Sequence, residues 1–143
     1  MTNRAGTDMP VITSRALIEG EAEGRLLVLE SDISFWGGID PNTGDVIDNR
    51  HPQFGESVAG RILAMNRSIG SSSGSSILLE LLRLGCGPAG IILIEADFII
   101  TLGAVVAREM GFGQIPVVQV SPKDFECLAG IARITRNGDI LCR

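Results

Sequence analysis

The sequence predicts one mixed α/β domain, with a central βαβαβ unit and antiparallel strands at both chain ends. Its 143 residues, 15.2 kDa, are enough for one hydrophobic core and too few for two full-sized ones. Hydrophobic residues make up 45% and charged residues 20%, which excludes a wholly disordered protein. The second half alternates short apolar runs with helical patterns, as expected for two consecutive right-handed crossovers between parallel strands. We therefore expect residues 1–143 to form a single domain, with the polar residues 1–10 loosely held.

The first sixty residues predict two strands followed by a long irregular segment. The strands are expected over 11–19 and 25–30, joined by the acidic turn 20–24. Residues 31–60 are rich in glycine, proline and asparagine, which are typical of loops. An irregular run of about thirty residues is rare in a compact domain and is usually functional. We therefore expect this segment to contribute to a site.

The remaining residues predict regular elements with recognisable ends. Gly85 is suited to end the first helix and Asp97 to begin the second. The pair Asn137-Gly138 is a strong hairpin signal. In chain order, the expected elements are a strand over 61–65, a buried helix over 75–84, a strand over 91–94, a helix over 98–110, a strand over 115–120, and a hairpin of 131–136 with 139–143.

Composition and charge exclude several classes of function. The net charge of -5 and the absence of a basic stripe disfavour binding to nucleic acid or anionic lipid. Residues 1–10 lack the apolar core of a signal peptide, and the apolar runs are too short to span a bilayer. The three cysteines, Cys86, Cys127 and Cys142, form no CxxC motif, so we expect neither a disulfide framework nor a metal site within this chain, and a reducing cytoplasm fits. The mean hydropathy of +0.29 favours burial of part of the surface against a partner, with a merely well-filled core as the alternative.

The most informative motif is the tract Gly-Ser-Ser-Ser-Gly-Ser-Ser at residues 70–76. A flexible linker is one interpretation, and N-capping of a helix by one serine is another. The tract lies directly between a predicted strand and a predicted buried helix, where linkers do not usually occur. A glycine-rich turn at a helix N-terminus presents backbone N–H groups and a positive dipole end to a carboxylate or phosphate. The same groups could stabilise the alkoxide of a serine held there.

Three further features are candidates for the site. The run Gly37-Gly38-Ile39-Asp40 followed by Pro-Asn-Thr-Gly has good turn chemistry, and its paired glycines could also let the backbone approach a ligand. His51 is the only histidine and lies in a loop beside proline, so it is either an ordinary loop residue or a catalytic one. Arg67, three residues before the Gly-Ser tract, could pair with a substrate carboxylate or remain solvated.

These motifs together resemble the small subunit of aconitase X. The resemblance covers residues from about 18 to 134 and rests on the stretches 37–44, 51–55, 60–63, 70–75, 90–94 and 103–118. It implies the swivelling β/β/α domain of aconitase-superfamily enzymes, docked on a large subunit that holds an iron or iron–sulfur centre. Ordinary aconitases carry Gly-Ser-Ser-Arg-Glu in this domain. The present chain matches at Gly70, Ser71 and Ser72 but has Ser73 in place of the substrate-binding arginine, which argues against a tricarboxylate substrate.

The resemblance also implies a reaction and roles for single residues. Aconitase X enzymes dehydrate cis-3-hydroxy-L-proline in bacteria and phosphomevalonate in archaea, and the run 68–80 is more similar to the bacterial form. Ser71 would be the base, and the partner's metal would act as a Lewis acid on the leaving hydroxyl. Gly70, Ser72, Ser73 and Arg67 would bind the substrate, while Gly37, Gly38, Asp40 and His51 would belong to an active-site loop.

Two other classes of function remain open at this stage. Residues 102–111 followed by 115–118 are similar to the mobile domain of phosphoenolpyruvate-utilising enzymes. Those domains place a phosphorylated histidine just before the helix, where this chain has Leu102-Gly103. The chain could also be a non-catalytic regulatory or structural subunit, which would keep the activity of its complex without Ser71.

Overall fold

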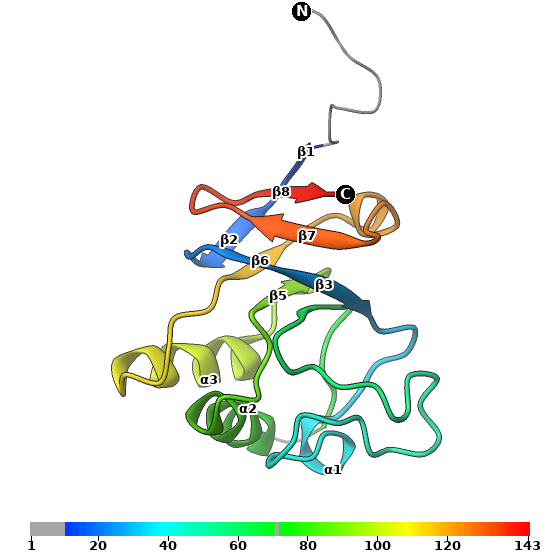
Figure 1. The fold of residues 1–143 in the computed structure, drawn as a ribbon, viewed down its shortest axis with the longest axis vertical. Coiled ribbons are helices and arrows are strands. Elements are labelled where there is room, and N and C mark those ends of the chain that lie inside the picture. Colours follow the sequence, from blue (N-terminus) through cyan, green and yellow to red (C-terminus); the bar gives the residue numbers. More distant parts are fainter. Residues whose placement is uncertain (1–10, 71) are drawn as a thin grey trace, which may run out of the picture.

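The computed structural model describes residues 11–70 and 72–143, so the expectations for residues 1–10 and for Ser71 lie outside the described residues. Eight strands form one sheet in the order β1-β8-β7-β3-β4-β5-β6-β2 (Figure 1). The elements are, in chain order, β1 (Val11–Thr13), β2 (Arg15–Ile18), β3 (Ala22–Val28), α1 (Phe35–Gly38), β4 (Ile62–Met65), α2 (Ser73–Leu84), β5 (Gly90–Leu93), α3 (Phe98–Glu109), β6 (Val117–Gln119), α4 (Pro122–Phe125), β7 (Ile131–Ile134) and β8 (Asp139–Cys142).

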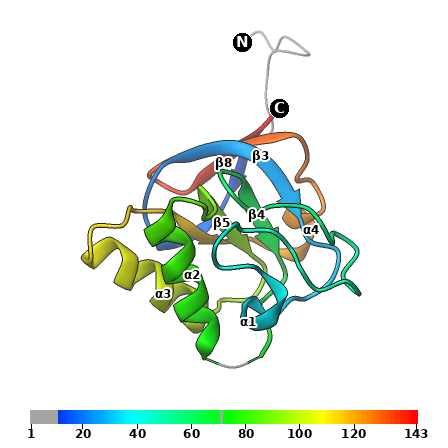
Figure 2. The same cartoon turned by 60° about the horizontal axis from the view of Figure 1, so that its bottom comes forward.

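The sheet is mixed, and its centre confirms the predicted βαβαβ unit. Strands β3, β4, β5 and β6 are parallel neighbours, whereas β1, β2, β7 and β8 pair antiparallel. Helices α2 and α3 are the two crossovers, and they lie side by side below the sheet (Figures 1 and 2). The buried side chains of β4 and β5 are apolar on both faces, as is expected where a parallel sheet is covered on both sides.

The three layers follow from the bend of β3. Its first half pairs with β7 through Ala22–Arg25, and its second half pairs with β4 through Leu26–Val28. The strand therefore passes from the antiparallel layer, β1-β8-β7, into the parallel one. One hydrophobic cluster lies between these two strand layers, and a second lies between the parallel strands and the helices. The result is the β/β/α arrangement that the resemblance implied (Figure 1).

The structure corrects several predicted boundaries near the N-terminus. The strand expected over 11–19 is divided at Ser14, whose N–H and hydroxyl both donate to the carbonyl oxygen of Gly138, at 3.1 and 2.6 Å. On either side of this residue, β1 pairs with β8 and β2 with β6, so the chain changes partner there. The acidic turn expected over 20–24 is shorter, because β3 already begins at Ala22 and ends at Val28. Pairing with distant strands, rather than local pattern, decides these ends.

The residues predicted to begin or end helices and to form the final turn were located more accurately than the ends of the N-terminal strands. Asp97 caps α3 as predicted, and Gly85 ends α2 with φ of 78°. The hairpin of β7 and β8 turns at Asn137-Gly138, as predicted. The short helix α4 was not predicted, although Ser121 followed by proline is a helix-start signal; its hydroxyl accepts from the N–H of Asp124 at 3.1 Å.

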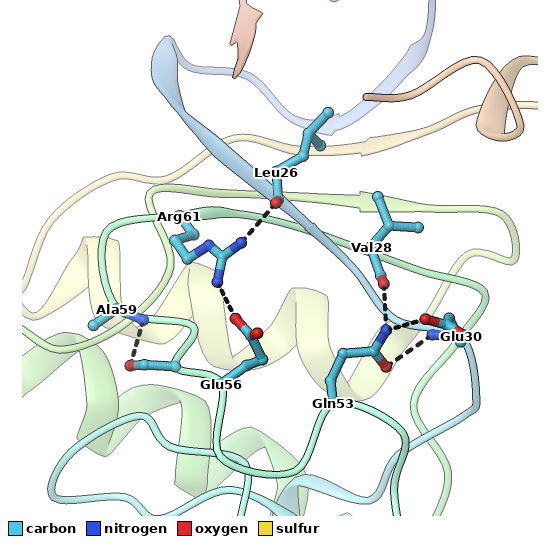
Figure 3. A network of polar contacts seen from close by, with 8 residues as sticks. Leu26, Val28, Glu30, Gln53, Glu56, Ala59 and Arg61 are labelled. Atoms are coloured by element: carbon cyan, nitrogen blue, oxygen red, sulfur yellow. Dashed lines mark hydrogen bonds and ion pairs between the residues drawn. The ribbon is translucent and has the colours of Figure 1, made fainter. Parts of the chain in front are cut away.

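The segment 31–60 is irregular, as predicted, but its polar side chains anchor it to the sheet (Figure 3). The guanidinium of Arg61 donates to the carbonyl of Leu26 at 2.8 Å and to Glu56 at 2.7 Å. The amide of Gln53 donates to the carbonyl of Val28 at 3.1 Å and to the Glu30 carboxylate at 2.9 Å. These bonds hold a segment of little regular structure in one place against β3. Within 11–70 and 72–143, no helix has the length and apolar character needed to cross a membrane.

Candidate active site at the glycine-serine loop

The Gly-Ser tract lies where β4 ends and α2 begins, at the carboxyl edge of the parallel strands. Beyond this edge, the segment after β4 runs beside the segment after β5. The N–H of Ile94 donates to the carbonyl of Met65 at 3.2 Å, and that of Glu95 donates to the carbonyl of Asn66 at 2.9 Å. The carboxyl ends of parallel strands are where open α/β sheets usually bind ligands. The loop therefore occupies a position suited to a site.

Position 70 requires a glycine, because of both its backbone conformation and the space around it. Its φ of 99° is a conformation that residues with a side chain rarely adopt, and a Cβ built there would lie 2.5 Å from the hydroxyl of Ser34. Just before it, the N–H of Ile69 donates to the carbonyl of Ile33 at 2.9 Å. The loop is thus packed closely against the start of the 31–60 segment.

The tract leads directly into a buried helix, which confirms the predicted placement for the described serines. Ser72 is the N-cap residue of α2, and its side chain makes no capping hydrogen bond. The hydroxyl of Ser75 donates back to the carbonyl of Ser72 at 2.9 Å. The first turn of α2 contains no acidic residue, so no carboxylate of that turn opposes the positive end of the helix dipole. This helix start is therefore electrostatically suited to an anionic ligand.

Arg67 and Gly70 line the same hollow, of about 320 Å³, together with Glu95, Asp97 and Phe98. The Arg67 side chain is about half exposed, and its Nε lies 3.3 Å from a carboxylate oxygen of Asp32. Its Nη1 lies 3.9 Å from the Glu95 carboxylate. The structure thus brings two of the predicted binding residues together, and it places the guanidinium between two carboxylates that the sequence did not indicate.

The two glycines of the predicted active-site loop lie near this hollow. Gly37 and Gly38 line a second hollow, of about 520 Å³, which is also lined by Ser34. Ser34 is the residue that excludes a side chain at Gly70, so the two hollows lie on either side of this contact. Asp48 lies in the wall of the second hollow, and a hydrogen bond from the backbone N–H of Arg50 holds the pKa of its carboxyl below the ordinary value.

Asp40 and His51 are engaged within the segment 31–60. The carboxylate of Asp40 accepts from the N–H of Asn42 at 2.9 Å, which is the Asx-turn geometry of a tight turn. His51 is only 6% exposed. Its Nδ1 accepts from the N–H of Gln53 at 3.0 Å, so Nε2 carries the proton that reaches the carbonyl of Ser31 at 2.9 Å. Neither residue lines the hollow of Arg67, and a catalytic role for them stays a prediction.

Several residues of the site were not found from the sequence. The Asp97 carboxylate, predicted only as a helix cap, also accepts from the N–H and hydroxyl of Ser68. Three large apolar side chains around the loop are exposed, Trp36 by 63%, Ile69 by 46% and Phe98 by 85%. Exposure depends on which elements cover a residue, so no local pattern identifies such a rim.

The described residues do not fit a metal centre. Among residues 11–70 and 72–143, no three side chains of His, Cys, Asp and Glu are grouped so that they could hold a metal ion. Of the carboxylates near the loop, Asp32 and Glu95 face Arg67, and Asp97 accepts hydrogen bonds from Ser68. We therefore derive no step through a metal on this chain, and the expected iron centre of a partner stays a prediction.

Comparison with known proteins identifies relatives along almost the whole chain. The family model described as the aconitase X swivel domain matches residues 11–141. A chain in the crystal structure of Thermococcus kodakaraensis aconitase X, in its holo-form, superposes with a TM-score of 0.82 at 32% sequence identity; the match covers 94% of this chain and 99% of that one.

The curated relatives have two different names. Cis-3-hydroxy-L-proline dehydratase of Hypocrea jecorina is 45% identical over 123 residues, and that of Pseudomonas aeruginosa is 46% identical over 107. These matches cover 86% and 75% of this chain but only 21% and 18% of those proteins, so the chain spans about a fifth of their length. The phosphomevalonate dehydratase small subunit of Pyrococcus furiosus is 42% identical over 96 residues, which cover 67% of this chain and 72% of that one.

Proposed function

The chain belongs to the aconitase X swivel domain family, and from this membership we propose that it is the small subunit of a hydro-lyase. The proposed reaction is the dehydration of cis-3-hydroxy-L-proline to Δ1-pyrroline-2-carboxylate. The observation that carries this proposal is that Arg67 lines one hollow with Gly70, the first residue of the Gly-Ser tract that leads into α2. An anion-binding helix start beside a guanidinium suits a substrate whose reacting carbon is attached to a carboxylate.

In the proposed mechanism Ser71 is the base. It removes the proton from the carbon next to the carboxylate, the hydroxyl on the adjacent carbon leaves as hydroxide and takes up a proton from the solvent to become water, and the resulting ring enamine tautomerises to the Δ1 imine. A serine hydroxyl is a weak base unless nearby N–H groups stabilise its alkoxide. The residues proposed to bind the substrate carboxylate beside it are Gly70, Ser72, Ser73 and Arg67, with Gly37 and Gly38 forming a neighbouring wall.

The charges around Arg67 support hydroxyproline over phosphomevalonate. Cis-3-hydroxy-L-proline carries a ring ammonium next to its carboxylate. A guanidinium flanked by the carboxylates of Asp32 and Glu95 offers one partner for each of these groups. Phosphomevalonate has no cation and adds a phosphate, which would meet one arginine and two carboxylates, Glu95 and Asp97, in this hollow. Phosphomevalonate remains the second candidate because a named small subunit of that enzyme is 42% identical.

A large subunit is the proposed partner, and we assign the iron or iron–sulfur centre to it. The exposed side chains of Trp36, Ile69 and Phe98 surround the loop and support the expectation of a covering surface. The much greater length of the two hydroxyproline dehydratases supports a larger body that acts together with this domain. We also propose a cytoplasmic location, because Cys86, Cys127 and Cys142 are all free thiols.

Reconstitution tests the proposal. The chain would be purified alone and together with a large aconitase X subunit, and each preparation would be assayed with cis-3-hydroxy-L-proline and with phosphomevalonate. We expect turnover of hydroxyproline by the complex and none by the isolated chain. Full activity of the chain alone would refute the partner requirement. Preference for phosphomevalonate would transfer the assignment to the second substrate, and a folded complex inactive on both would overturn the hydro-lyase proposal.

A further inference from the structure

We propose that Asp97 is a positioning residue, whose carboxylate aligns the Gly-Ser loop with helix α3 and so sets the geometry of the proposed base. The part of this inference that concerns turnover rests on the proposed function. The part that concerns the loop rests on hydrogen bonds alone. Asp97 is not assigned any contact with substrate.

The two oxygens of the Asp97 carboxylate hold different parts of the chain. Oδ1 accepts from the N–H groups of Ile99 and Ile100, both at 3.0 Å, and so caps α3. Oδ2 accepts from the N–H of Ser68 at 3.1 Å and from the hydroxyl of Ser68. Capping alone uses only the first oxygen. The second joins α3 to a residue 29 positions away in the sequence, in the strand-to-helix loop.

Helix α3 also contacts the far end of the same loop. Gly103 lies so close to the first turn of α2 that a Cβ built on it would be 2.7 Å from the carbonyl oxygen of Ser75. The loop thus meets α3 before the turn, through Ser68 and Asp97, and after it, through Ser75 and Gly103. One helix therefore contacts the chain on both sides of the turn, at Ser68 and at Ser75.

The opposite side of the loop is held more weakly by exposed groups. Arg67 reaches Asp32 at 3.3 Å, but its side chain is half exposed, and exposed ion pairs contribute little. The N–H of Ile69 also donates to the carbonyl of Ile33 on this side. Between the described residues 66–70 and their surroundings, the partly buried bridge of Asp97 to Ser68 is therefore a stronger side-chain constraint than the exposed pairs of Arg67.

The variant Asp97→Asn distinguishes the role of Asp97 as a helix cap from its role in positioning the loop. Asparagine caps a helix about as well as aspartate, because its side-chain oxygen can take the place of Oδ1. Its NH₂ group would then face Ser68, whose backbone N–H would lose its acceptor, while the hydroxyl could keep a bond only by turning to accept one. Ser68→Ala is the complementary variant, since it removes only the hydroxyl bond and leaves the cap intact. Ser121→Ala is the matched control, because it removes a side-chain cap, the bond from Asp124 at 3.1 Å, at the start of the separate helix α4.

The experiment measures amide hydrogen exchange by NMR in the full chain, and kcat and KM in the complex with a large subunit. For Asp97→Asn we expect exchange of the Ser68 amide to accelerate about tenfold or more as its charge-assisted bond is lost. We expect kcat to fall about tenfold or more with KM changed less than about threefold, because misplacing a reactive group slows the chemical step. Ser68→Ala should lie between Asp97→Asn and the wild type, and Ser121→Ala should match the wild type in both measurements.

The outcomes separate this inference from the function on which it partly rests. Wild-type exchange and wild-type kcat in Asp97→Asn would overturn it. A loss of stability with unchanged kcat in the folded complex would reduce Asp97 to a structural cap and would also overturn it. If Asp97→Asn fails to fold, an unaltered kcat in Ser68→Ala overturns it, whereas the intermediate fall supports it. If the wild-type complex dehydrates neither substrate, the proposed function fails, and exchange at Ser68 still decides whether Asp97 holds the loop.

Discussion

Two loop segments, residues 31–60 and residues 66–70, differ in how they are held. The first is held by side chains: His51 and Gln53 reach the backbone carbonyls of Ser31 and Val28, and Arg61, the residue after the segment, joins Glu56 to the carbonyl of Leu26. The second is held by neighbouring backbone, by the carboxylate of Asp97 and by the exposed ion pairs of Arg67. Polar side chains of the long segment are therefore occupied in hydrogen bonds that hold the fold together. The short segment leads to the start of α2, where the side chain of the N-cap serine makes no capping hydrogen bond.

This difference shows that a segment of irregular sequence can have either of two roles, to stabilise the fold or to bind a ligand. Both segments contain the residues from which binding loops are made, and both were predicted to contribute to the site. A side chain whose donors and acceptors already have partly buried backbone partners cannot reach a ligand without breaking those bonds. Substitutions in the long segment should therefore change stability, and substitutions around the Gly-Ser loop should change turnover.

The largest expected effect is that of Ser71→Ala. Turnover by the reconstituted complex should fall about 10²-fold or more, the usual scale for loss of a general base. Stability should change by no more than about 1 kcal/mol, the contribution of a hydroxyl at a helix cap. Assay of kcat together with complex formation and iron content measures this, with Ser76→Ala, at an exposed serine of α2, as the control. Near-normal kcat in an intact complex would place the base elsewhere.

His51→Ala should show the opposite behaviour. The change removes a side chain that is 6% exposed, together with its hydrogen bonds to the N–H of Gln53 and the carbonyl of Ser31. We expect a loss of about 2–3 kcal/mol in the free energy of unfolding, since each such hydrogen bond contributes about 1 kcal/mol and the lost packing of a buried side chain adds to this. Urea unfolding monitored by circular dichroism checks this. A large fall in kcat at temperatures where the variant is fully folded would instead place His51 in the site. The long segment would then not differ from the Gly-Ser loop in its contribution to turnover.

Arg67→Gln tests the predicted binding residue on the short loop. Loss of the guanidinium should lower kcat/KM about tenfold, mainly through KM, because a charged hydrogen bond to the substrate carboxylate disappears. The free energy of unfolding should change by less than about 0.5 kcal/mol, because the ion pair with Asp32 is exposed. Steady-state kinetics and urea unfolding of the same variant measure both quantities. An unchanged KM would mean that Arg67 does not bind the substrate and forms only its ion pairs with Asp32 and Glu95.

The smallest effect is expected for Gln53→Ala. Its amide bonds to Val28 and Glu30 tie the long segment to β3, but part of this network is exposed (Figure 3). We expect a loss of about 1 kcal/mol in the free energy of unfolding, the typical net value of one such hydrogen bond. Values of kcat and KM should equal those of the wild type. Altered kinetics would show that the long segment transmits its position to the site.

The sequence by itself determined the features that depend on neighbouring residues. The βαβαβ unit follows from apolar patterns, the cap of α3 from Asp97, the end of α2 from Gly85 and the final hairpin from Asn137-Gly138. It also located the candidate site, since a glycine-serine turn between a strand and a buried helix can lie only at the carboxyl edge of the sheet. Each signal acts within a few residues, so tertiary packing had little to alter.

The tertiary structure alone decided which distant groups meet. Pairing of β3 with both β7 and β4 bends that strand from one layer to the other, and the change of partner at Ser14 divides the first predicted strand. Packing also gave Arg67 its carboxylate neighbours and buried the ring of His51. Such contacts join residues from about 20 to more than 100 positions apart, and their free energy depends on burial and geometry that no local pattern encodes.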